Sequence, residues 1–118
     1  MLINDKPQNL TYDDFAKLDI RVGTIQSIDL VPKSKKLIKL EVSFGDVIGN
    51  RTILAGVAQA HTDGRVLVGQ KIVAILNLAP REMMGIMSHG MLLAAHDAED
   101  KVWLVNPGGP IPDGNDIG

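Results

Sequence analysis

The sequence contains no cysteine and no long apolar run. Without cysteine, the chain has no disulfide framework, no thiolate nucleophile and no cysteine-ligated zinc or iron–sulfur site. Its apolar stretches, such as 72–76, are far shorter than the roughly 20 residues that a membrane-spanning helix needs. The first residues also lack the basic start and the apolar segment of a secretory signal. These absences predict a cytoplasmic chain without a membrane span.

Aromatic residues and net positive charge are also scarce. Aromatic residues make up 3% of the chain, which is too few for a platform that stacks successive bases of a single strand. The net charge of −2 argues against a protein that coats nucleic acid by bulk electrostatics. The charge is uneven, however, because 20–96 carry nine basic and five acidic residues, whereas the two ends carry three and nine. The basic cluster at 33–39 is either a local site for a polyanion or a solubilising loop.

The hydrophobic pattern predicts one small domain covering 1–118, built mainly of strands. The clearest strand signal is at 38–44, where apolar residues alternate with polar ones. A long strand at 20–31 is expected to bulge or bend at Gly23, and further strands are expected at 52–57, 71–78, 90–95 and 102–105. A short capped helix is expected at 11–17, a Met-rich turn at 81–87, and either a helix or a compact loop at 58–69. This pattern predicts an all-β fold, a five-stranded Greek-key OB-fold barrel with a short helix between the third and fourth strands.

The residues that carry chemistry do not form a catalytic or metal-binding pattern. Ser88 and His89 are neighbours on an extended segment, so their side chains point to opposite sides and cannot form an activated pair. The three histidines lack metal-ligand spacing, and no glycine-rich phosphate loop is present. The sequence therefore predicts a protein that is not an enzyme and that holds no metal or cofactor.

Four ordered blocks, at 14–23, 36–45, 77–85 and 88–91, resemble one family of tRNA-binding OB domains. Its members occur as small dimeric proteins, as C-terminal domains of many methionyl-tRNA synthetases, and as CsaA chaperone-like proteins. The resemblance implies non-catalytic, structure-dependent binding to the body of a tRNA by a homodimer, with an aminoacyl-tRNA synthetase as a further partner. It also implies that the extensions at 1–10 and 106–118 pack at the dimer interface.

The resemblance implies seven tRNA-binding residues: Lys33, Lys35, Lys36, Asn77, Arg81, Ser88 and Met91. The lysines and the arginine suit phosphates, whereas the amide and the hydroxyl suit sugar or base edges. From the residues alone, Asn77 can instead bond local backbone, Ser88 can be a turn hydroxyl and Met91 can fill the core. Ala79 and Glu82 stand where relatives often carry bases, which predicts weaker tRNA binding or a shift toward the lysine loop.

A CsaA-type module that binds polypeptide is the alternative function. Its support is four methionines within nine residues, which could form an adaptable apolar surface. The simpler expectation is that most of these residues fill the core. They are Met83, Met84, Met87 and Met91.

Overall fold

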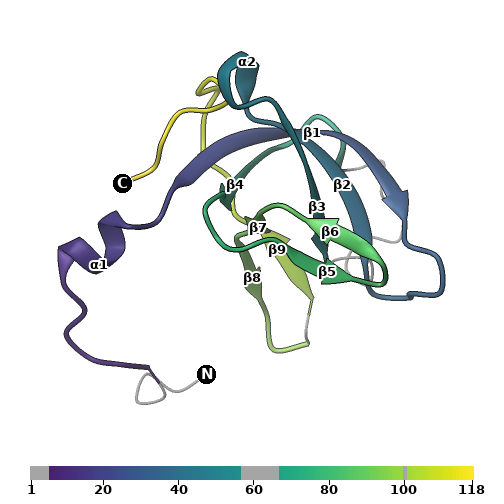
Figure 1. Cartoon of the computed structure of the whole chain (residues 1–118), viewed down its shortest axis with the longest axis horizontal. Coiled ribbons are helices and arrows are strands. Elements are labelled where there is room, and N and C mark those ends of the chain that lie inside the picture. The colour runs from purple at the N-terminus through teal and green to yellow at the C-terminus, as the bar shows by residue number, and fades with distance from the viewer. Residues whose placement is uncertain (1–5, 57–66, 100) are drawn as a thin grey trace.

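The computed structural model describes residues 6–56, 67–99 and 101–118, and its centre is a five-stranded antiparallel sheet in the order β3-β2-β1-β4-β7. The long strand β1 (Ile20–Leu30) pairs with β2 (Ile38–Ser43) on one side and with β4 (Lys71–Ile75) on the other. β3 (Asn50–Ala55) extends the sheet beyond β2, and β7 (Met91–Leu92) extends it beyond β4. The sheet curls until β3 contacts β7 (Figure 1), which gives the nearly closed OB-like barrel that the sequence predicts.

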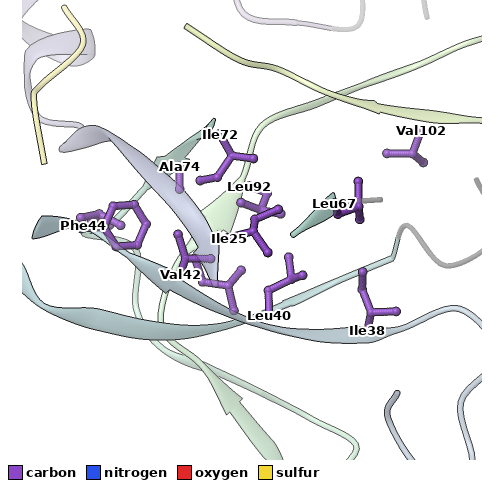
Figure 2. Packing of buried hydrophobic residues seen from close by; sticks show 12 residues of the cluster. Ile25, Ile38, Leu40, Val42, Phe44, Leu67, Ile72, Ala74, Leu92 and Val102 are labelled. Atoms are coloured by element: carbon purple, nitrogen blue, oxygen red, sulfur yellow. The ribbon is translucent and has the colours of Figure 1, made fainter. Parts of the chain in front are cut away.

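The barrel interior is filled by aliphatic side chains and one phenylalanine (Figure 2). The alternation at 38–44 is confirmed, because Ile38, Leu40, Val42 and Phe44 are all buried. Ile25 from β1 lies fully buried among them. Period-2 alternation is reliable here because β2 is a central strand whose one face covers the core.

Gly23 has a different role from the expected one. The register of β1 against β2 shifts between Ile25 and Ser27, so the bulge lies there and not at Gly23. A Cβ at Gly23 would lie 2.7 Å from Phe44 Cε1 and 2.7 Å from Val42 Cγ1. The glycine is therefore needed for close packing of the core against β1.

The first of the two short helices has the cap that its sequence predicts. α1 (Tyr12–Ala16) begins with the expected cap: Thr11 Oγ1 accepts from the backbone N–H of Asp14, whose carboxylate accepts from the Thr11 N–H. α2 (Gly45–Ile48) is one turn within the expected turn region before β3. Most of the segment 58–69, for which a helix or a compact loop is expected, lies outside the described residues. No helix in the described part of the chain is long and apolar enough to cross a membrane.

In the second half of the chain, two hairpins form where the sequence predicts a turn at 81–87 and a single strand at 90–95. The predicted turn at 81–87 is a hairpin of β5 (Arg81–Met83) and β6 (Ile86–Ser88), with Met84 and Gly85 at positive φ in its turn. The predicted strand at 90–95 divides into β7 and β8 (Ala94–His96), because β7 pairs with β4 whereas β8 pairs with β9 (Val102–Leu104). Strands of two or three residues are too short for a periodic signal.

The C-terminal tail runs along β1 of the same chain. Asn115 O accepts from Val22 N at 3.0 Å, and Gly114 N donates to Val22 O at 2.8 Å. Asp113 Oδ1 accepts from Thr24 Oγ1 at 2.6 Å and pairs with Lys71 Nζ at 2.6 Å. The tail thus completes the barrel surface, while the dimer contact expected of 1–10 and 106–118 remains a prediction.

Candidate nucleic-acid interface

The β5–β6 hairpin sorts its side chains between two faces. Arg81 lies directly opposite Ser88, and Glu82 lies opposite Met87. Because opposed residues of an antiparallel pair share a face and successive residues alternate, Arg81, Met83 and Ser88 face one side. Glu82 and Met87 face the other side, so the acidic carboxylate points away from Arg81.

A cavity of about 350 Å³ opens on the Arg81 side of this hairpin, and we call it the groove. Its wall combines side chains from β3 and from every strand between β5 and β9, together with the segment that follows β4. Three of the seven predicted site residues, Arg81, Ser88 and Met91, line it. The structure therefore brings together residues that a linear motif keeps ten positions apart.

The lysine loop, residues 33–36, borders the groove. Lys36 O lies 3.8 Å from the position of a Cβ at Gly56, and Gly56 lines the groove. The Ser34 hydroxyl accepts from the backbone N–H groups of Lys36 and Leu37 at 3.3 and 3.0 Å, which shapes the loop. The Lys33 backbone adopts a positive φ of 65°.

The four cations of this surface are Lys33, Lys35, Lys36 and Arg81, and all are exposed. None of them forms an ion pair or a side-chain hydrogen bond within residues 6–56, 67–99 and 101–118. Their charge is therefore available to an anion, in contrast to Arg21 and Lys71, which are paired with carboxylates.

Ser88 is buried, with 4% of its surface exposed. Its Oγ accepts from Leu54 N at 3.0 Å and donates to Gly90 O at 3.2 Å. The hydroxyl thus joins β3 to the β6–β7 connection, and it makes no bond to the neighbouring His89 side chain. This geometry corresponds to the turn-hydroxyl alternative of the sequence analysis.

Asn77 joins the end of β4 to the segment that leads into β1. Its Oδ1 accepts from Asp19 N at 2.8 Å, and its Nδ2 donates to Lys17 O at 2.6 Å. Asp19 O accepts from Leu76 N at 2.8 Å, which closes the clamp. The Asp19 carboxylate accepts from Arg21 Nε at 2.6 Å, and this hydrogen bond raises the pKa of Arg21 above its ordinary value.

Arg51 has a structural role that sequence reasoning missed. Its Nη1 donates to Leu76 O at 2.8 Å and to His89 O at 3.3 Å, so one guanidinium joins the ends of β4 and β6 beside the groove. The sequence marks Arg51 only as one base among nine, because both acceptors are backbone atoms more than twenty residues away.

The expectation that most methionines fill the core is wrong. Met84, Met87 and Met91 expose 53%, 43% and 53% of their surface. Only Met83 and Met91 of the four lie on the groove. Met84 lies in the turn of the β5–β6 hairpin and Met87 on its outer face, where neither packs into the core, and Met91 lies on β7 at the end of the sheet.

No group of three His, Asp or Glu side chains that could hold a metal ion occurs in the described part of the chain.

Comparison with known proteins places these features in a family. The model of the family described as "Putative tRNA binding domain" matches residues 20–116. The chain belongs to this tRNA-binding domain family. It is 43% identical over 111 residues to the methionine–tRNA ligase of Cytophaga hutchinsonii. The matched segment covers 94% of this chain but only 16% of that protein. It therefore spans about a sixth of that relative's length.

Two solved structures resemble the domain over almost its full length. One is a MetRS-related protein from Pyrococcus horikoshii, with a TM-score of 0.85, 32% identity, and coverage of 94% of this chain and 99% of that one. The other is the CsaA chaperone protein of Picrophilus torridus, with a TM-score of 0.83, 34% identity, and coverage of 93% and 100%. The fold is thus shared by proteins named for a synthetase and for a chaperone.

Proposed function

We propose that this domain binds folded tRNA without catalysing a reaction, and that it acts beside an aminoacyl-tRNA synthetase in the cytoplasm. The observation that carries the proposal is a set of exposed cations without partners among the described residues, on a domain of the tRNA-binding family: Arg81 lines the groove, and three lysines lie on the loop beside it. Phosphate contacts supply most of the affinity of such sites and need no catalytic group.

The seven predicted residues divide into two groups under this proposal. Lys33, Lys35, Lys36 and Arg81 contact phosphates, and Met91 contacts a base. Asn77 and Ser88 hold this surface in place through their bonds to distant backbone. Their contribution to tRNA binding is therefore positional.

The test is a gel shift with an unmodified tRNA transcript. Arg81→Glu, or charge reversal at both Lys35 and Lys36, should abolish retention of the tRNA while the unfolding transition stays unchanged. Lys101→Glu is the matched control, because Lys101 is exposed, lies outside the two extensions expected at the dimer interface and does not line the groove. Equal loss in the control would mean that only net charge matters and would contradict the proposed surface.

We also propose that the domain acts as a homodimer. Figure 1 shows α1 standing away from the barrel, and none of its residues is buried. Leu10, Tyr12, Phe15 and Leu18 expose between 37% and 77% of their surface. The last residues of the chain, 116–118, share a hollow with α1, so both terminal segments form one surface. In a dimer with a two-fold axis, this surface of each subunit would pack against the same surface of the other. A monomeric mass by light scattering at tens of micromolar would contradict the dimer.

Polypeptide binding of the CsaA type is the second candidate. It is favoured by the exposed Met84 and Met87 on the hairpin, since flexible apolar side chains suit varied partners. A fluorescently labelled unfolded polypeptide, titrated beside the tRNA transcript, separates the two candidates.

A further inference from the structure

We propose that the groove accepts one unstacked nucleobase of the bound RNA, with Arg81 on the adjacent phosphate. This inference rests on the proposed binding of folded tRNA and adds the recognition element within it. A folded RNA exposes such bases in loops and bulges, and proteins read RNA mainly at these points.

The wall chemistry of the groove suits a base. Leu78 and Met91 line it while remaining 42% and 53% exposed, so they offer apolar surface that nothing in the described residues covers. Met83 adds a second thioether to the wall. Thioether sulfur makes favourable contacts with aromatic rings, so these side chains can replace the aromatic platform that the sequence lacks.

The size of the groove suits one nucleoside. Its volume of about 350 Å³ is at the lower end of the range for small-molecule sites, roughly 300–1,000 Å³. Ala79 and Gly90 both line it and add little bulk to the wall, since alanine carries one methyl group and glycine has no side chain. A Cβ at Gly90 would lie 2.9 Å from Ile53 Cδ1, so this position has no room for a larger residue.

Charge favours a nucleotide over an uncharged ligand. Arg81 projects on the groove side of its hairpin with no partner among the described residues. The lysine loop approaches the wall at Gly56, through the backbone O of Lys36. A base in the groove therefore places its phosphate within reach of Arg81, and the neighbouring phosphates near the lysine loop.

The backbone around the groove argues against an added peptide strand. β3 forms the wall, and a peptide strand would need its free backbone groups. Leu54 N already donates to the Ser88 hydroxyl, and Thr52 O already accepts from His89 N at 2.9 Å. Successive backbone groups on the outer edge of β3 are thus taken.

The experiment fills the groove without changing charge. Ala79→Trp places a large ring at an exposed groove residue, and Ala95→Trp is the matched control on an exposed residue of β8 that does not line the groove. Met91→Ala is a second variant that removes wall surface at an exposed position. The probes are an unmodified tRNA transcript and a blunt RNA duplex of equal length, and urea unfolding establishes that each variant is folded.

The expected result is selective. Ala79→Trp weakens tRNA binding by about tenfold or more, which is the scale of one lost stacking contact, while the dependence of affinity on salt stays the same. Met91→Ala weakens it by several-fold, whereas Ala95→Trp binds tRNA as the wild type does. The duplex binds the wild type more weakly than tRNA, and Ala79→Trp does not alter duplex binding.

Two results would overturn the inference while leaving the proposed function intact or replacing it. If folded Ala79→Trp binds tRNA like the wild type, with the same salt dependence, the groove takes no base although tRNA binding stands. If a reduced, carboxymethylated polypeptide binds the wild type, and only Ala79→Trp abolishes this binding, the groove is a polypeptide site. If the wild type itself shows no salt-dependent tRNA binding, the proposed function fails first.

Discussion

The salt dependence of tRNA binding tests the proposed contacts quantitatively. The surface has four exposed cations without partners in the described structure, namely Lys33, Lys35, Lys36 and Arg81. Each neutralised phosphate contributes about −0.7 to −0.9 to the slope of log affinity against log salt. Four contacts therefore predict a slope of about −2.8 to −3.6 for each engaged subunit. Raising salt from 50 to 200 mM should weaken binding by roughly 50- to 150-fold.

Removing one cation makes this prediction sharper. Arg81→Gln should reduce the slope by about 0.7–0.9, so that the same salt increase weakens binding by only roughly 20- to 40-fold. The measurement is fluorescence anisotropy of a labelled tRNA transcript at five salt concentrations, with Lys101→Gln as the control of equal charge change. A wild-type slope near zero, or an equal reduction in the control, would refute the assignment of phosphate contacts to this surface.

Three further predictions concern the stability of the fold. Gly23→Ala should lower the free energy of unfolding by about 1–3 kcal/mol in urea titration, because its Cβ would lie 2.7 Å from two core side chains; Gly109→Ala, with no atom within 4 Å, should be near neutral. Ser88→Ala should cost about 1–3 kcal/mol by leaving a buried strand N–H unpaired, and a loss of tRNA affinity without a loss of stability would instead indicate direct contact. The hydrogen bond from the Trp103 indole lowers the pKa of Asp97 in the folded protein. The ionised Asp97 carboxylate therefore stabilises the fold above the ordinary carboxyl pKa of about 3.9. This stabilisation is lost as the pH falls through the lower pKa of the folded state. Fluorescence of Trp103, the only tryptophan, should report this change, and Asp97→Asn should remove it.

The parts of the fold that could be predicted from sequence are those with a local physical cause. The alternation at 38–44 repeats for long enough to define a buried face. The Thr11 and Asp14 cap is encoded within four residues. The role of Gly23 could not be predicted, because the atoms that approach it belong to Val42 and Phe44, about twenty residues later in the chain.

The candidate site divides in the same way. The lysine loop is visible in the sequence as a charge cluster, whereas its position beside the groove depends on the pairing of β2 with β3, which brings Lys36 close to Gly56. The bonds that commit Asn77 and Ser88 span 58 and 34 residues, so no local pattern separates a binding role from a structural one. The groove itself could not be predicted from the sequence, since the residues that line it are spread over positions 54 to 102 and come together only in the folded barrel.

The two departures from the family pattern have different consequences in this geometry. Glu82 lies opposite Met87 on the outer face of the hairpin, so its carboxylate is directed away from the groove that Arg81 lines. Ala79 lies on the groove wall, where a long basic side chain would occupy space that the alanine leaves open. Under the proposed function, the loss of charge at 79 is therefore accompanied by room for a base, and phosphate binding depends more on the lysine loop. Ala79→Lys should accordingly steepen the salt dependence of tRNA binding and reduce the preference for tRNA over duplex RNA. An Ala79→Lys variant with both a steeper salt dependence and a stronger preference for tRNA would contradict the proposed role of the groove.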